Sequence, residues 1–164
     1  MTGDAAPPIV VMGVSASGKS AVGAALADRL GVAYVDADDL HPQANVDKMT
    51  AGIPLDDADR WPWLDAVAAR LAEGPVVIAC SALKRTYRDR LRAVAPRTVF
   101  VHLTGDRAVL EARIAARKGH FMPASLLQSQ LETLEDPAPD EAAFALDFAE
   151  PVDTLVAQAL ERIR

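Results

Sequence analysis

The sequence of 164 residues contains little that would support a disulfide framework or a membrane span. Its one cysteine, Cys80, cannot form an internal disulfide and cannot frame a metal site alone. A chain without disulfides suits a reducing compartment, so we expect a cytoplasmic location. Apolar runs such as Ile9–Met12 and Val76–Cys80 are far shorter than the roughly 20 residues that cross a bilayer, so we expect no membrane partner.

Positive charge is also scarce. The formal net charge is −6 and there is no long basic run, whereas a nucleic-acid surface needs clustered Lys and Arg, so we expect no nucleic-acid partner. Before the first apolar run the chain has Asp4 but no Lys or Arg, which argues against a signal peptide, and we expect residues 1–7 to be flexible. The length and the 51% hydrophobic composition are typical of one globular domain spanning residues 1–164.

Short apolar runs alternate with helical patterns along the chain. The runs are typical of parallel strands that are covered on both faces. They are Pro8–Met12, Val32–Asp36, Val76–Cys80, Thr98–Leu103 and Ala143–Asp147. The helical patterns are Ser20–Leu30, Trp63–Ala72, Lys84–Val94, Arg107–Arg117, Ala124–Leu134 and Val152–Ile163. This order predicts an α/β domain of three layers with right-handed crossovers.

Three segments between these elements are predicted to be loops. They are Gly52–Arg60, Lys118–Pro123 and Pro137–Glu141. The segment Lys118–Pro123 lies between two predicted helices, which is a place where a flap can form.

The sharpest motif is Gly13-Val14-Ser15-Ala16-Ser17-Gly18-Lys19-Ser20, which fits the P-loop pattern G-x-x-x-x-G-K-[ST]. It follows a predicted strand and opens a predicted helix, as a P-loop must. The glycines allow the loop to point backbone N–H groups at phosphate oxygens beside the positive end of the helix. We expect Lys19 to reach the β- and γ-phosphates and Ser20 to place its hydroxyl on Mg²⁺.

A P-loop alone does not separate a kinase from a GTPase or an ATP-driven motor. No Asn-Lys-x-Asp guanine signature is present in the sequence, and the chain is short for a motor. A Gly/Ser-rich turn that binds nothing is the alternative, and the strand before the motif and the helix after it argue against this.

A second polar cluster follows the second predicted strand, as Asp36-Ala37-Asp38-Asp39-Leu40-His41. Ligands of open parallel sheets gather at the carboxyl ends of strands. Asp36 and Asp38 are two residues apart, so along an extended segment they point to the same side. One can serve Mg²⁺ through water, and the other can take the proton from an acceptor hydroxyl. The alternative for this cluster is a solvated acidic turn that caps the next helix. We prefer that alternative for Asp39, and the functional role for Asp36 and Asp38 together.

Other candidates each have a structural alternative. His41 is able to bond a polyol or cap a helix that starts near Pro42, and Lys48 lies in the cleft or on an exposed helix face. Ser81 and Lys84 follow the third predicted strand, close to the P-loop. Arg60 is able to hold a carboxylate in a two-pronged contact or to form a surface ion pair.

Cys80 and the two tryptophans Trp61 and Trp63 are better explained as packing residues. Arg113 and Arg117 are four residues apart, on one helix face, where a basic segment would neutralise a transferred phosphoryl group. The alternative for both is an ordinary surface helix.

Taken together, these segments resemble the bacterial thermoresistant gluconokinases, which belong with shikimate kinase and adenylate kinase among small P-loop kinases. The resemblance covers the chain from about Ile9 to the last helix. Besides the P-loop, it rests on Asp36-x-Asp38-x-x-His41-Pro42, Asn45-x-x-Lys48-Met49, Gly52–Leu64, Cys80-Ser81-Ala82-Leu83-Lys84-x-x-Tyr87-Arg88-Asp89 and Arg117-Lys118-Gly119-His120-Phe121. The segments around Cys80 and His120 are far more specific than the P-loop.

The resemblance implies a P-loop kinase fold with a five-stranded parallel sheet in order 2-3-1-4-5 and a helical lid at about 117–134. It implies the reaction of ATP with D-gluconate to give 6-phospho-D-gluconate and ADP, with Mg²⁺, in a homodimer. Nucleotide contacts are then expected from the P-loop through Ala21, from Arg113 against adenine, from Arg117 near the phosphates, and from the loop Phe148–Pro151 along the adenine pocket.

On the acceptor side, the resemblance gives Asp38 as the base, with Asp36 behind Mg²⁺. Arg60 is expected to bind the substrate carboxylate, with His41, Lys84 and His120 as further candidates.

One departure from the family bears on the backbone of the P-loop. Many members have glycine at the position of Ala16. A positive φ would cost an alanine about 1 kcal/mol, so we predict an ordinary negative φ at Ala16.

Two other functions stay open at this point. One is a kinase for a different hydroxy acid or polyol, such as shikimate. The other is a nucleotide-binding module without turnover. The intact set Lys19, Ser20, Asp36 and Asp38 argues against the second, since a binding module has no need of acceptor-side carboxylates.

Overall fold

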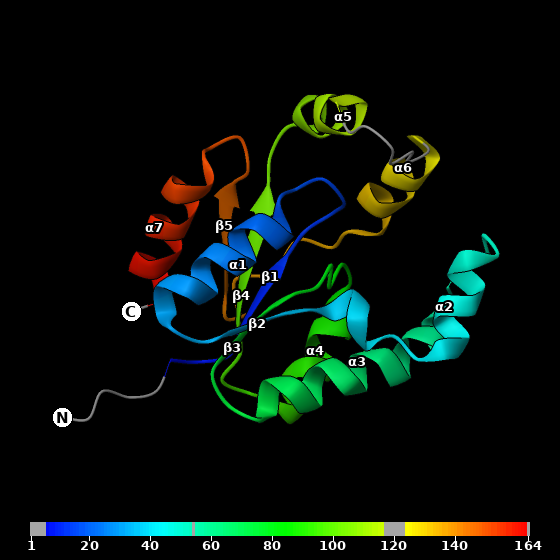
Figure 1. Cartoon of the computed structure of the whole chain (residues 1–164), viewed down its shortest axis with the longest axis horizontal. Coiled ribbons are helices and arrows are strands. Elements are labelled where there is room, and N and C mark those ends of the chain that lie inside the picture. Colours follow the sequence, from blue (N-terminus) through cyan, green and yellow to red (C-terminus); the bar gives the residue numbers. More distant parts are fainter. Residues whose placement is uncertain (1–5, 54, 117–123, 164) are drawn as a thin grey trace.

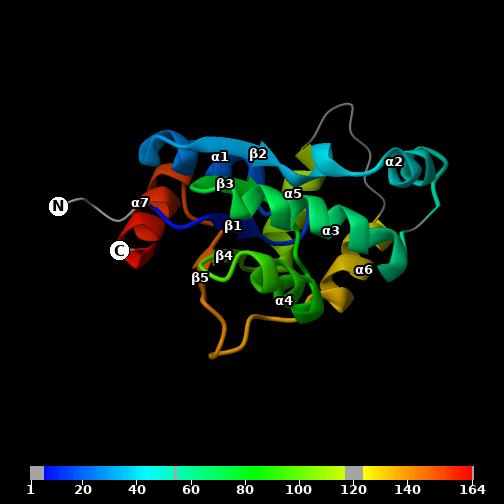
Figure 2. The same ribbon diagram turned by 90° about the horizontal axis from the view of Figure 1, so that it is seen from below.

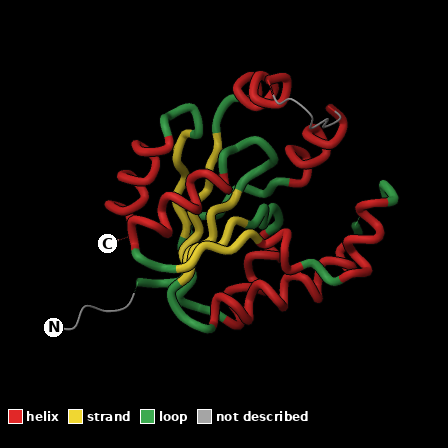
Figure 3. Tube along the Cα trace, viewed as in Figure 1, coloured by secondary structure: helices red, strands yellow, loops and turns green. Residues whose placement is uncertain are grey.

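A computed structural model of the chain describes residues 6–53, 55–116 and 124–163. Five parallel strands form one sheet in the order β2-β3-β1-β4-β5, as the sequence predicted. The strands are β1 (Ile9–Met12), β2 (Ala33–Asp36), β3 (Val76–Ala79), β4 (Val99–Thr104) and β5 (Ala143–Asp147). Figure 3 shows them as one twisted sheet inside a shell of helices.

The helices form a layer on each face of this sheet. They are α1 (Lys19–Leu30), α2 (Gln43–Thr50), α3 (Asp57–Ala72), α4 (Arg85–Val94), α5 (Arg107–Ala116), α6 (Ala124–Thr133) and α7 (Val152–Ile163), with one 3₁₀ turn, η1 (Ala37–Leu40). Helices α1 and α7 cover one face, and α3 and α4 cover the other (Figures 1 and 2). The predicted three-layer arrangement is confirmed.

The strand β1 shows why the apolar runs lack polar residues. Ile9 and Val11 pack in the core beneath α1 and α7, while Val10 and Met12 pack beneath α3 and α4. All four side chains are fully buried. Burying each such side chain contributes about 1.5–3 kcal/mol, so a central strand of this sheet leaves no place for a polar group.

Helix α3 departs from the prediction because it begins at Asp57, within the segment that we expected to be a loop. Asp56 and Asp59 form a capping box: the Asp56 carboxylate accepts from the Asp59 N–H at 2.8 Å, and the Asp59 carboxylate accepts from the Asp56 N–H at 3.0 Å. The box holds the helix start firmly enough for Pro62 to lie inside the helix, although proline removes one helical hydrogen bond.

The carboxyl ends of the strands point toward α5 and α6, and α2 projects from the body of the domain (Figure 1). The chain therefore places the P-loop, the end of β2 and the end of β3 at one edge of the sheet. Within the described segments, no helix is both long and apolar enough to cross a membrane.

Candidate active site

The P-loop lies between β1 and α1, as predicted. A Cβ atom on Gly13 would lie 2.8 Å from both Leu103 O and Ser17 Oγ, so only glycine fits there. Gly18 has φ +96° and comes directly before α1, whose first N–H groups therefore open toward the loop. The Lys19 ammonium donates to Val14 O at 3.1 Å, across the loop itself. Such a loop offers N–H donors, a helix N-terminus and a cation to an anion.

The prediction of a negative φ at Ala16 is wrong, because its φ is +69°. Two hydrogen bonds hold the backbone around Ala16 in this turn. The Ser17 N–H donates to Val14 O at 3.2 Å, and the Ala16 carbonyl accepts from Arg113 Nη1 at 3.0 Å. For an alanine this left-handed conformation costs about 1–2 kcal/mol. The loop carries that strain because neighbouring groups fix its path.

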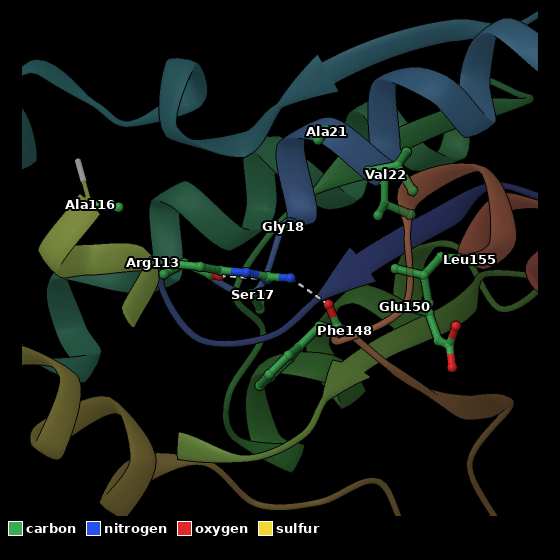
Figure 4. A pocket seen from close by; sticks show the side chains of 11 residues that line it. Ser17, Gly18, Ala21, Val22, Arg113, Ala116, Phe148, Glu150 and Leu155 are labelled. Atoms are coloured by element: carbon green, nitrogen blue, oxygen red, sulfur yellow. Dashed lines mark hydrogen bonds between the residues drawn. The ribbon is translucent and has the colours of Figure 1, made fainter. Parts of the chain in front are cut away.

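A pocket of about 400 Å³ joins the P-loop to the loop between β5 and α7 (Figure 4). Its floor and walls are mostly small or apolar: Ala16, Ser17, Gly18, Ala21, Val22, Ala116, Phe148, Val152 and Leu155, with Arg113 and Glu150. The guanidinium of Arg113 donates to Ala16 O and, at 2.5 Å, to Phe148 O, and lies 5.4 Å from the centre of the Phe148 ring. Pro151 is not among the lining residues, but both of its neighbours are.

The two predicted carboxylates meet at the end of β2, but the segment is not extended as expected. The chain turns at Ala37 into η1, and Asp36 Oδ1 caps that turn by accepting from the Asp38 N–H at 3.0 Å. Asp38 is exposed, yet partial shielding from water raises the pKa of its carboxyl, and repulsion by Asp36 adds to this. The positive charge of Lys19 and the neighbouring His41 act in the opposite direction and limit the rise in pKa.

The ring of His41 stacks on Trp63, with centroids 4.3 Å apart and planes 12° from parallel. His41 Nδ1 lies 3.2 Å from the buried amide nitrogen of Asn45, which is a donor, so Nε2 is assigned the hydrogen. Burial lowers the pKa of the His41 imidazole, and Arg60 adds to this while Asp38 opposes it. His41 is thus neutral at pH 7 and able to offer an N–H to a hydroxyl group.

Arg60 and Lys84 come together around a carboxylate that the sequence did not single out, that of Asp57. Lys84 Nζ donates to Asp57 Oδ1 at 3.3 Å, and the Tyr87 hydroxyl donates to the same oxygen at 2.5 Å. Arg60 Nη1 lies 3.9 Å from that oxygen and donates to Leu55 O at 3.0 Å. The Tyr87 hydrogen bond and the two cations lower the pKa of the Asp57 carboxyl. Two hydrogen-bond donors, Lys84 and Tyr87, and the nearby cation of Arg60 therefore surround one carboxylate position.

The remaining acceptor-side candidates are placed differently. Lys48 donates to both carboxylate oxygens of Asp59 at 2.8 Å, so it ties α2 to the capping box of α3. Ser81 is half-buried two residues after the end of β3, next to Ala82, whose φ is +44°. Asp39 is exposed in η1, in line with the solvated turn that we preferred. Cys80 is 2% exposed and burial raises the pKa of its thiol to about 12, which confirms its packing role.

The oxygen ligands available for Mg²⁺ are the hydroxyl of the exposed residue Ser20, at the start of α1, and the Asp36 carboxylate. Within the described residues, no group of three or more His, Cys, Asp or Glu could hold a metal ion. This sparse set of hard oxygens fits Mg²⁺, which dehydrates reluctantly and usually binds through one or two protein oxygens, waters and substrate phosphates.

Three predictions fall outside the described residues. The first concerns the flexible segment 1–7, of which residues 1–5 are not described. The second concerns Arg117 near the phosphates and His120 near the acceptor. The third concerns the loop 118–123 with the first part of the lid, since residues 117–123 are not described. The described part of the predicted lid is α6.

Comparison with known proteins decides the family. The family model described as an AAA domain matches residues 9–137. The thermoresistant gluconokinase of Escherichia coli (strain K12) is 45% identical, over 94% of this chain and 92% of that protein. The gluconokinase of Gluconobacter oxydans (strain 621H) is 44% identical, over 95% of this chain and 90% of that protein. The chain belongs to the gluconokinase family.

A solved member of the gluconokinase family has the same structure. The crystal structure of a gluconokinase from Sinorhizobium meliloti 1021 has a TM-score of 0.89 at 54% identity, and the match covers 96% of this chain and 91% of that one. A shikimate kinase from Aquifex aeolicus shares the fold at 16% identity, with a TM-score of 0.62. At this identity the likeness concerns the fold alone.

Proposed function

We propose that the chain transfers the γ-phosphoryl group of ATP to the C6 hydroxyl of D-gluconate, giving 6-phospho-D-gluconate and ADP. The observation that carries the proposal is the meeting of two parts at one edge of the sheet. The P-loop with Lys19 follows β1 and the two carboxylates lie at the end of β2, these strands being the two neighbours of β3 in the sheet, and the charge of Lys19 opposes the rise in the pKa of Asp38. The kinship with gluconokinases supports gluconate as the acceptor.

On the nucleotide side, the P-loop N–H groups from Gly13 to Ser20 hold the phosphates, and Lys19 neutralises the β- and γ-phosphates. The pocket between Arg113 and the loop Phe148–Pro151 takes the adenine, with Ala21 at its wall. The planar guanidinium of Arg113 then lies against the planar adenine ring. Arg117 is the further cation that we propose near the phosphates.

Mg²⁺, when bound with the nucleotide, neutralises charge on the β- and γ-phosphates. Ser20 would hold it through its hydroxyl, and Asp36 through water.

On the acceptor side, Asp38 accepts the proton of the C6 hydroxyl as that oxygen forms its bond to the γ-phosphorus and the bond to ADP breaks. The raised pKa of Asp38 makes it a stronger base than an ordinary aspartate. Arg60 and Lys84, which together face a carboxylate in this structure, bind the carboxylate of gluconate. His41, Lys48, Ser81 and His120 are the proposed contacts of the gluconate hydroxyls.

A coupled assay of ADP release over a panel of acceptors tests the function. The panel contains D-gluconate, other aldonates, shikimate and neutral polyols of the same length. We expect gluconate to give the highest kcat/KM. An acid that exceeds gluconate by more than about tenfold, or 1.4 kcal/mol in transition-state binding, would assign the chain to a different acceptor. ATP binding without ADP release on any acceptor would indicate a binding module.

We also propose that the protein forms a homodimer and works in the cytoplasm. Each subunit is then one kinase domain over residues 1–164. Light scattering measures the molar mass of the protein as it elutes from a size-exclusion column. Loading concentrations that span a tenfold range then test the oligomeric state. A constant monomer mass would reject the dimer and would leave the proposed reaction unaffected.

A further inference from the structure

A hydrogen bond joins helix α6 to the P-loop. Gln130, half-buried on α6, accepts a hydrogen bond at 2.7 Å from the backbone N–H of Ser15, with its Oε1 atom. The two residues are 115 positions apart in the sequence. Ser15 lies in the middle of the P-loop, where backbone N–H groups serve phosphate oxygens.

The chain is anchored at Glu135, two residues beyond the end of α6 at Thr133. The Glu135 N–H donates to Leu83 O at 2.7 Å, and Glu135 Oε1 accepts from the Arg85 N–H at 2.9 Å. The segment that contains Leu83 and Arg85 is also held by Arg88, whose Nη1 donates to Ala82 O at 2.8 Å. Because the chain is fixed just beyond α6, the Gln130 amide is held in a defined position relative to the P-loop.

A hydrogen bond of this kind has a direct consequence for a ligand. An N–H group donates well to one acceptor at a time, and a nucleotide phosphate that uses the Ser15 N–H must displace the amide oxygen of Gln130. The amide is neutral, so it satisfies the donor without the full attraction that a phosphate feels. The contact therefore stabilises the ligand-free loop at the expense of the nucleotide complex.

We propose that Gln130 is an internal ligand of the P-loop, which occupies the Ser15 N–H and competes with the nucleotide phosphates for it. The inference rests on the proposed function only in taking the P-loop as the phosphate site. It adds a residue outside the P-loop that sets nucleotide affinity.

The test is isothermal titration of the full chain with ADP in the presence of Mg²⁺ and without acceptor. Gln130→Met keeps the length of the side chain and removes the acceptor oxygen. We expect this variant to bind ADP about fivefold more tightly, since a net hydrogen bond of about 1 kcal/mol no longer has to be broken. A gain of affinity is a result that loss of structure does not produce.

Two further variants sharpen the test. Gln130→Glu keeps an acceptor oxygen and adds a negative charge beside the phosphates, so ADP should bind several-fold more weakly. Gln128→Met is the matched control, because Gln128 lies on the same helix but contacts Glu132 and Arg107 at the surface. Its ADP affinity should equal that of the wild type.

Unchanged or weakened ADP binding by Gln130→Met, with the wild type binding normally, would overturn this inference alone. Failure of the wild-type chain to bind ADP would reject the proposed function and this inference with it.

Discussion

The carboxylate of Asp38 shows how position in the fold changes the chemistry of a single side chain. Shielding from water and the neighbouring Asp36 raise its pKa, while Lys19 and His41 limit the rise. An aspartate in this setting is therefore more basic than one in water. This balance suits a group that must take a proton from a hydroxyl.

Replacing this carboxylate tests its role. We predict that Asp38→Asn lowers kcat by orders of magnitude while ATP binding survives, because an amide of the same shape cannot take the proton. Steady-state kinetics and a nucleotide titration measure the two effects separately. Asp39→Asn, one position further along η1 and exposed, is the control and should keep most of the activity. Near-normal turnover by Asp38→Asn would remove Asp38 from the role of base.

The raised pKa of Asp38 also predicts a stability effect. A carboxyl whose pKa is raised by folding stabilises the protein when protonated, below its ordinary value of 3.8, and loses that contribution as pH rises through the raised pKa. At pH 7 the ionised group is therefore destabilising. Thermal melts should show a higher Tm for Asp38→Asn than for the wild type at pH 7, and the gap should close below pH 3.8. A lower Tm at pH 7 would contradict the direction of the shift.

At the scale of elements, what the sequence predicts well is what depends on neighbours in the chain. The P-loop was predicted because its glycines, its strand and its helix are adjacent. The start of α3 was missed because its capping box uses Asp at both positions, whereas the usual sequence signature has Ser or Thr followed three residues later by Glu or Gln. The positive φ of Ala16 was missed because Arg113, far along the chain, helps to fix the loop.

The cap of α3 gives a prediction at this scale. Asp56→Ala should lower the free energy of unfolding by about 1 kcal/mol, since the Asp59 N–H loses its acceptor at the helix start. Asp56→Asn keeps an acceptor oxygen and should be nearly neutral. Urea denaturation measures both variants, and equal losses in the two would mean that the hydrogen bond is not the source of the effect.

At the scale of the whole molecule, one buried ion pair ties distant segments together. Arg88 and Glu141 are 53 positions apart, with side chains 0% and 1% exposed, and Arg88 Nε donates to Glu141 Oε1 at 2.7 Å. Burial works against the ionised Glu141, but hydrogen bonds from Arg88, the Ala138 N–H and Arg92 outweigh it and lower the pKa of Glu141 to about 2. The pair holds the segment before β5 against α4.

Removing the charge of Glu141 leaves Arg88 buried without a counter-ion. Glu141→Gln should lower the free energy of unfolding by about 3–5 kcal/mol at pH 7. Because folding depresses the pKa of Glu141, its contribution is full above the ordinary value of 4.5 and is lost as pH falls toward 2. The gap between variant and wild type in urea denaturation should shrink over that range.

An exposed ion pair provides the control. Arg90 Nε donates to Asp65 Oδ1 at 2.7 Å, with side chains 40% and 55% exposed. Asp65→Asn should cost less than about 1 kcal/mol. A loss in Glu141→Gln no larger than this would show that burial adds nothing to the pair.

The sheet order, the layers and the family were predictable from the whole sequence, because apolar periodicity and family motifs extend along it. The Asp57–Tyr87 and Ser15–Gln130 contacts were not, because no local pattern marks pairs that only the fold brings together.

Cys80 has a practical consequence for following this protein in solution. It is the only thiol in the sequence, and its burial keeps it protonated and shielded from alkylating reagents. A cysteine introduced on the outer side of α6, such as Leu126→Cys at a position 45% exposed, would be the one group to react with a maleimide dye. Site-specific fluorescent labelling then needs a single substitution and no prior removal of a native reactive group.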